Sequence, residues 1–152
     1  MKRFTMKFIS PLVLTAFLGV GFSTTAQAAD YKIKFYKIYA LDDGDHWRGG
    51  ELYISTYLEG DIIINNRKMY INARNNPTVN LTDVNTTISV ADGEDLTIKV
   101  QAGQEAVMLK DDKCSGETVI KPSAFRGDIL IPCRHRKDSL ALDFYVFVKK
   151  IN

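Results

Sequence analysis

The fold of this chain is decided by a stretch near its C-terminus, which reads Leu140-Ala141-Leu142-Asp143-Phe144-Tyr145-Val146-Phe147-Val148-Lys149. Leu, Phe and Val occupy every second position, and a period of two is typical of a β-strand, in which successive side chains point to opposite faces of a sheet. Large side chains also occupy the intervening positions Tyr145 and Phe147. We therefore predict a strand in the middle of a sheet.

The same period runs through residues 31–40, where the apolar positions shift phase after Phe35. We predict a β-bulge near Phe35, because one extra residue would restore the register. The pattern predicts further strands at 51–58, 62–72, 78–90 with a break near Asp83, 96–101, around Val107, 118–120 and 128–131.

Short polar turns with Gly, at 59–61 and 92–95, fit the joints between these strands. No window of ten or more residues keeps a helical period. About eight short strands predict a single all-β domain, an antiparallel β-sandwich. Strand count and alternation leave a closed barrel as the alternative.

The first 28 residues have the features of a bacterial signal peptide. Three basic residues precede an apolar run from Pro11 to Phe22, and the small-residue triplet Ala26-Gln27-Ala28 follows it. We predict cleavage after Ala28, which leaves 29–152 as one exported domain, periplasmic or secreted. The apolar run is shorter than the roughly 20 residues of a membrane-spanning helix, and no comparable run follows.

The charge of the chain changes when this leader is subtracted. The full sequence carries 20 Lys and Arg and 18 Asp and Glu, for a net charge of +2. Lys2, Arg3 and Lys7 belong to the leader, so the exported domain has a net charge of −1. Nucleic acid is disfavoured as a partner, because phosphate recognition requires a broad basic surface.

Cys114 and Cys133 are the two cysteines of the chain. In an oxidising compartment they are expected to form a disulfide, which closes a loop of about 20 residues and contributes roughly 3 kcal/mol. A reactive thiol or a metal pair is the alternative, but the spacing is not Cys-x-x-Cys and His135 is a lone neighbour.

Acidic residues gather in three of the predicted loops. If consecutive strands are antiparallel, the loops 42–50, 73–77 and 101–113 lie at one end of the sandwich, and 59–61 and 91–95 lie at the other. Asp92, Glu94 and Asp95 are therefore set aside as a solvated turn. The remaining acidic residues could supply oxygen ligands to Ca²⁺, which takes six to eight of them: Asp42, Asp43, Asp45, Asp111 and Asp112.

Two stretches of the sequence resemble a known family of domains. The first reads Leu41-Asp42-Asp43-Gly44-Asp45-His46-Trp47-Arg48-Gly49-Gly50-Glu51-Leu52-Tyr53-Ile54. It is similar to the first loop, and the strand after it, of a C2 domain, the calcium- and lipid-binding β-sandwich. Leu96-Thr97-Ile98-Lys99-Val100, with the segment 111–120, is similar to its later strand, third loop and following strand. The resemblance covers roughly residues 31 to 125 and implies a non-enzymatic binding module.

The chain departs from the family pattern at two places. Gln101-Ala102-Gly103-Gln104 stands where the family has two alternating Asp, and Glu51 stands where a second first-loop Asp is expected. What carries over is one weak calcium site, formed by Asp43 with Asp42 or Asp45, Glu51, and Asp111 or Asp112. A calcium-independent variant of the family is equally compatible with these residues, and so is a solvated acidic loop.

Two further groups are candidates for partner binding. Trp47 and Arg48 could anchor at an anionic lipid surface or in a protein pocket, or Trp47 could cap the end of the sandwich. The run Arg134-His135-Arg136-Lys137, which follows Cys133, could bind phosphate, lipid headgroups or an acidic protein, or form a solvated hairpin tip.

These residues predict an exported module without catalytic residues, which binds calcium weakly and presents Trp47 and Arg48 to an anionic lipid or a protein partner. No other cofactor is implied. The alternative is a secreted or periplasmic protein inhibitor that uses the basic loop with Arg134, Arg136 and Lys137 and no metal. A small hydrolase is the least favoured class, because the sequence lacks a nucleophile elbow, a phosphate-binding Gly loop and a His-Glu-x-x-His pair.

Overall fold

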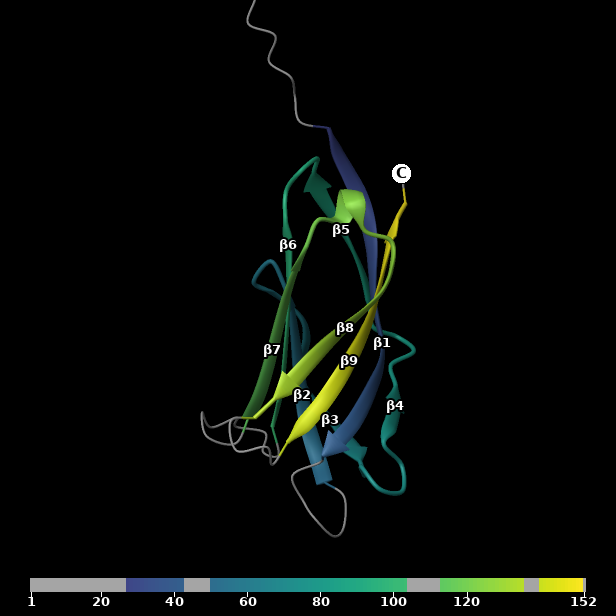
Figure 1. Cartoon of the computed structure of the whole chain (residues 1–152), viewed down its shortest axis with the longest axis vertical. Coiled ribbons are helices and arrows are strands. Elements are labelled where there is room, and N and C mark those ends of the chain that lie inside the picture. Colours follow the sequence, from purple (N-terminus) through teal and green to yellow (C-terminus); the bar gives the residue numbers. More distant parts are fainter. Residues whose placement is uncertain (1–26, 43–49, 104–112, 136–139, 152) are drawn as a thin grey trace, which may run out of the picture.

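The structure is a computed structural model that describes residues 27–42, 50–103, 113–135 and 140–151. These residues form nine strands and one 3₁₀ turn (Figure 1): β1 (Ala28–Asp42), β2 (Gly50–Leu58), β3 (Asp61–Ile71), β4 (Thr78–Asn80), β5 (Asn85–Ala91), β6 (Leu96–Gly103), β7 (Lys113–Ile120), η1 (Pro122–Ala124), β8 (Gly127–Arg134) and β9 (Ala141–Lys150). None of the described residues forms a helix with the length and apolar character that a membrane crossing requires.

The predicted all-β fold is confirmed. The strand count exceeds the expected eight because the break near Asp83 divides residues 78–90 into β4 and β5. β7 and β8 are longer than the predicted runs 118–120 and 128–131. The run around Val107 lies outside the described residues, and the proposed leader lies outside them up to residue 26.

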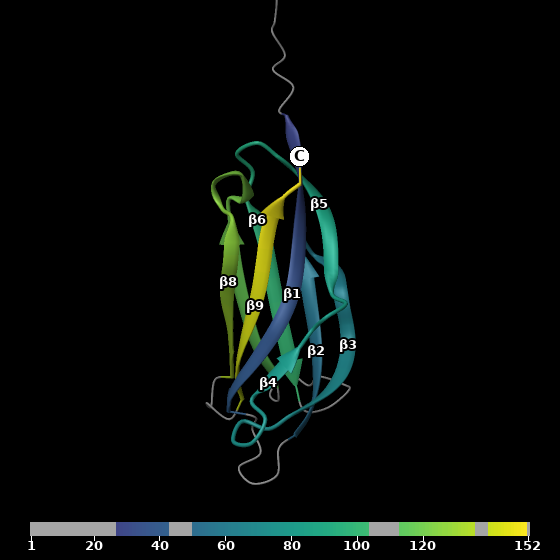
Figure 2. The same cartoon turned by 90° about the vertical axis from the view of Figure 1, so that its right-hand side faces the viewer.

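All the strand pairs are antiparallel, in the order β3-β2-β6-β7-β8-β9-β1-β4, and β5 also pairs with β1. Within the described residues β7 and β8 are joined by a single pair, Ser115 with Arg134. The strands therefore form two layers that meet along this narrow seam. One layer holds β3, β2, β6 and β7, and the other holds β8, β9, β1, β4 and β5 (Figure 2).

Strands β9 and β1 form the centre of the second layer. The register between them shifts between Phe35 and Lys37, so the predicted bulge is confirmed. With this extra residue, the apolar side chains before and after it all point into the core. Ile33, Phe35 and Ile38 are fully buried there, as is Phe144 of β9 at 1% exposure.

The turn between β2 and β3 has the backbone of a tight hairpin. Glu59 and Gly60 both have positive φ, at 51° and 89°, as a two-residue type I′ turn requires. The backbone N–H of Glu59 donates to the carbonyl of Thr97 at 3.1 Å, and the Glu59 carboxylate accepts from the N–H of Thr97. This reciprocal pair attaches the turn to the start of β6.

A disulfide crosses the seam between the two layers. Cys114 of β7 and Cys133 of β8 are bonded, with their Cα atoms 5.3 Å apart, and both are fully buried. The predicted pairing is therefore confirmed, and the described residues contain no free cysteine. The bond joins the layers next to the single strand pair that connects them.

The opposite side of the sandwich is closed by an ion pair. Arg67 Nη1 of β3 donates to Asp83 Oδ1 in the β4–β5 connection at 2.9 Å. This contact joins the outer strand of one layer to the far edge of the other. The hydrogen bond from Arg67 lowers the pKa of Asp83 below its usual 3.8.

The lowered pKa of Asp83 predicts a small pH-dependent contribution to stability. Because the folded state holds the carboxylate ionised, the contribution is present above pH 3.8 and is lost as the pH falls through the lowered pKa. We expect Asp83→Asn to reduce the unfolding midpoint slightly at pH 7 and to match the wild type at the acid end, as measured by thermal unfolding at several pH values. A difference between the two proteins that grows toward low pH would contradict this assignment.

Candidate functional site

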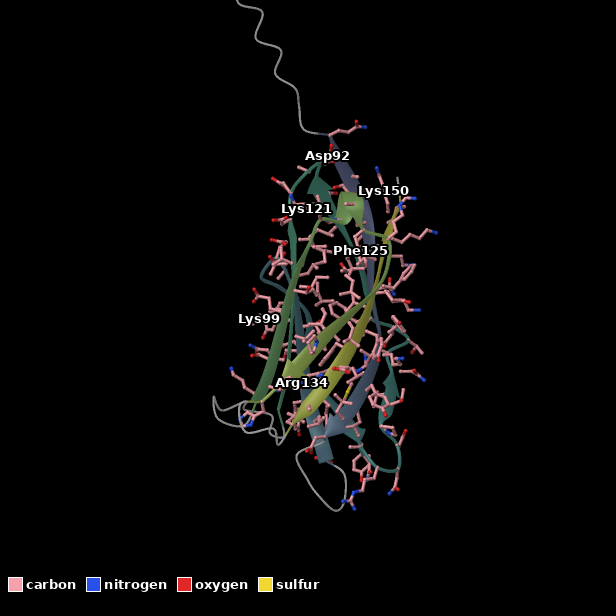
Figure 3. All side chains as sticks on the ribbon, in the orientation of Figure 1. Asp92, Lys99, Lys121, Phe125, Arg134 and Lys150 are labelled. Carbon is pink, nitrogen blue, oxygen red and sulfur yellow. A yellow bond between two sulfur atoms is a disulfide. The ribbon has the colours of Figure 1, made fainter. Side chains whose placement is uncertain are left out.

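The loops predicted to converge do begin and end at one end of the sandwich. Residue pairing places the last residues of β1, β3 and β6 beside the first residues of β9, β2 and β7, through Asp42 with Ala141, Ile71 with Gly50, and Gly103 with Lys113. The turn at 92–95 lies at the other end, where Figure 3 labels Asp92. The strand-parity prediction is therefore confirmed.

Most of the predicted ligands and partner-binding residues at this end lie outside the described residues: Asp43, Asp45, Trp47, Arg48, Asp111, Asp112, Arg136 and Lys137. Asp42 and Glu51 are described. Glu51 Oε2 forms an ion pair with Lys68 Nζ at 2.7 Å, and this bond raises the pKa of Lys68. Within the described residues no group of three or more His, Cys, Asp or Glu is placed to hold a metal ion.

Arg134, the described member of the predicted basic loop, is bound to its own hairpin. Its Nη2 donates to Asp143 Oδ1 at 2.6 Å, and its Nη1 donates to the carbonyls of Leu142 at 2.6 Å and Cys133 at 3.1 Å. The Asp143 side chain is 12% exposed, so the guanidinium compensates a largely buried carboxylate. Arg134 fastens β8 to β9 beside the disulfide, near the lower end of the molecule in Figure 3.

A second cluster of charge lies on the outer surface of β1 and β9. Residues that lie opposite each other on neighbouring strands share a face of the sheet. Lys32 lies opposite Lys149, Lys34 opposite Phe147, and Lys37 opposite Tyr145. We call this surface the basic face, and it consists of four lysines and four aromatic residues: Lys32, Lys34, Lys37, Lys149, Tyr36, Tyr39, Tyr145 and Phe147.

Aromatic contacts order the middle of the basic face. Lys37 Nζ lies 3.7 Å from the ring centroid of Tyr145, within the range of a cation–π interaction. The rings of Tyr36 and Tyr145 are 6.2 Å apart, centroid to centroid, and tilted by 57°. Phe147 and Tyr39 remain 37% and 36% exposed. The face therefore presents ring surfaces to solvent between its ammonium groups.

The acidic groups near the basic face have partners of their own. Asp128 accepts a hydrogen bond from Tyr36, and this bond, after the larger effect of burial, raises the pKa of Tyr36. Asp143 is held by Arg134. On the other side of β1, the neighbours of Lys32, Lys34 and Lys37 are Thr87, Asn85 and Asn80, which carry no charge. The four lysines therefore outnumber the acidic residues of the same surface, Asp30, Asp128 and Asp143, of which Asp143 is paired with Arg134.

The basic face is not evident from the sequence alone. The net charge of −1 predicted for the exported domain gave no indication of it, because many of the acidic residues lie in loops and turns while these lysines share one sheet face. The usable signal was the alternation of Lys32 and Lys34 in one strand with Lys149 at the end of another. That these lysines lie side by side becomes clear only from the pairing of β1 with β9 in the structure.

The chain was compared with known proteins. No protein-family model matches it, and no curated protein does. The solved structures to which it is similar include a C2 domain protein from Ramazzottius varieornatus, at 14% identity and a TM-score of 0.47, covering 84% of this chain and 91% of that one. They also include a C2 domain of plant extended synaptotagmin 1, at 13% identity and a TM-score of 0.48, covering 82% and 96%. C2 domains, which two stretches of the sequence resemble, are thus also found by the comparison of folds.

Proposed function

We propose that this chain is a non-catalytic binding module that docks on anionic phospholipid surfaces through the basic face. The observation that supports this function is the register of β1 and β9, which gathers four lysines and four aromatic rings on one sheet surface. Of the acids on the same surface, Asp143 is paired with Arg134, Asp128 accepts from Tyr36, and Asp30 accepts from Ser89. Ammonium groups attract anionic headgroups, and amphipathic rings favour the interfacial region of a bilayer.

The expected strength follows from the number of lysines. A Lys near an anionic membrane surface contributes about 1 kcal/mol, so three of the four lysines would together contribute roughly 3 kcal/mol. That energy corresponds to roughly a 100-fold change in partition coefficient. The attraction is screened by salt, because the Debye length falls from about 10 Å at 0.1 M to about 3 Å at 1 M.

We expect the oxidised domain, residues 29–152, to sediment with vesicles of phosphatidylcholine and phosphatidylserine and not with phosphatidylcholine alone. Replacing Lys32, Lys34 and Lys149 with Gln should weaken this binding roughly 100-fold, and added salt should release the wild type. The matched control replaces three lysines elsewhere on the molecule with Gln, at Lys99, Lys113 and Lys121. Equal losses in the two triple variants would contradict docking through the basic face.

A chelator arm separates this proposal from the calcium site predicted at the loop end. Lysines bind anionic headgroups without a metal, so we expect vesicle binding to persist in the presence of a chelator. Binding that requires added Ca²⁺ and survives the Lys32, Lys34 and Lys149 substitutions would instead favour the predicted acidic site. Asp43→Ala together with Asp112→Ala would then abolish it.

A further inference from the structure

A hollow lies on the outer surface of β2, β6 and β7, in the layer that does not carry the basic face. It has a volume of about 430 Å³, within the roughly 300–1,000 Å³ of small-ligand sites. Its lining is Tyr57, Gly60, Thr97, Lys99, Gln101 and Glu117. We call it the tyrosine hollow. Figure 3 shows Lys99 on the side of the molecule formed by β6 and β7, away from Lys150 at the end of β9.

The strand register brings these side chains into adjacent rows. Tyr57 of β2 lies opposite Lys99 of β6, and Lys99 lies opposite Glu117 of β7. Gln101 is in the next row, with Ser115 beside it. An aromatic ring, an ammonium, a carboxylate and a carboxamide therefore meet on one face within two rows of the sheet.

Tyr57 is held across the sheet. Its hydroxyl donates to Gln101 Oε1 at 3.4 Å, a long hydrogen bond to the neighbouring strand. The ring therefore leans over β6 and forms one side of the hollow. At the rim, the turn with Gly60 is fixed by the reciprocal hydrogen bonds between Glu59 and Thr97. The hollow is thus preformed rather than assembled from a loose loop.

The hollow is electrically balanced, unlike the basic face. It contains one cation, Lys99, and one anion, Glu117, and neither is engaged in the ion pairs among the described residues. Thr97 and Tyr57 add hydroxyl groups, and Gln101 offers amide N–H donors. One ammonium, one carboxylate, two hydroxyls and an amide thus surround one aromatic ring. Such a mixture of hydrogen-bond donors and acceptors is suited to a neutral ligand that carries many hydroxyl groups.

We propose that the tyrosine hollow binds a neutral carbohydrate. The C–H face of a sugar ring would pack on Tyr57, because such a face is apolar and matches an aromatic ring. The sugar hydroxyls would donate to Glu117 and accept from Lys99 and the Gln101 amide. The site is separate from the basic face and does not depend on lipid binding.

The test is native affinity electrophoresis of the oxidised domain in gels that contain one soluble neutral polysaccharide each: xylan, mannan, mixed-linkage glucan or amylopectin. We expect at least one of them to retard the domain. Tyr57→Ala should abolish the retardation, and Glu117→Ala, at an exposed position, should weaken it at least tenfold. Tyr57→Phe keeps the ring and should retain most of the binding.

The matched control is Tyr70→Ala, an exposed tyrosine of β3 that lies about 20 Å along the strands from Tyr57. It should bind like the wild type, and thermal unfolding should show that every variant is folded. Absence of retardation in all four gels would overturn the proposal, and so would retention in both Tyr57→Ala and Glu117→Ala. A fifth gel contains heparin as the anionic control, and retardation there but in none of the neutral gels would assign binding to the basic face and also overturn the proposal.

Discussion

Replacing Cys114 and Cys133 together with alanine is expected to lower the free energy of unfolding by about 3 kcal/mol. The two cysteines are 19 residues apart, and releasing the bond restores the conformational freedom of this loop to the unfolded chain. The bond also crosses the seam where one residue pair connects β7 with β8. Its loss therefore has two effects. It frees the unfolded chain, and it weakens the connection between the two layers of the folded state.

Urea unfolding of the wild type and the double variant under non-reducing conditions measures this difference. The wild type in reducing buffer should match the variant, because both lack the same bond. Ser115→Ala, an exposed neighbour in β7, should change the free energy of unfolding by about 0.5 kcal/mol or less. A loss below about 1 kcal/mol in the double variant would show that the seam holds without the disulfide.

Gly116→Ala is expected to cost about 2–3 kcal/mol, although it adds a single methyl group. A Cβ atom at this position would lie 2.2 Å from the carbonyl oxygen of Pro132 and 2.9 Å from its carbonyl carbon. Both atoms are backbone of β8, so the strand itself would have to move. Val100, whose Cγ2 would be 3.2 Å away on the other side, limits movement of β7.

The measurement for Gly116→Ala is again urea unfolding of the oxidised protein. Gly93→Ala serves as a contrast, because a Cβ there meets open space and the cost arises from its positive φ of 82° alone. Stability of Gly116→Ala equal to the wild type would mean that β7 and β8 are farther apart than the structure places them. Because Gly116 and the disulfide act on the same seam, their effects are expected to be non-additive.

The features that the sequence predicted correctly are local ones. Three of them lie within short windows of sequence: the alternation around Phe144, the phase shift after Phe35 and the break near Asp83. In each, the side-chain alternation of a β-strand determines the local structure, namely a strand, a bulge and a strand end. The disulfide was predictable because two cysteines allow one intramolecular pairing. Strand parity then placed the loop ends correctly without any tertiary information.

The surfaces proposed as binding sites were not predictable in this way. Lys32 and Lys149 are neighbours through the pairing of the first strand with the last, and Tyr57 meets Glu117 through two strand registers. The role of Arg134 was also missed, because its partner Asp143 appeared in the sequence as one polar position of a strand. Pairing partners far apart in the sequence determine each of these contacts.

The pairing of β1 with β9 also has a consequence for how the domain folds. These strands hold opposite ends of the chain, and they pair from Tyr31 with Lys150 to Asp42 with Ala141. A nascent chain that has not yet reached residue 141 leaves β1 without this neighbour. Folding rates fall as contacts become more distant in sequence, since the loop between them must be closed first. The pairing of β1 with β9 is therefore expected to form later in folding than local hairpins such as that of β2 with β3.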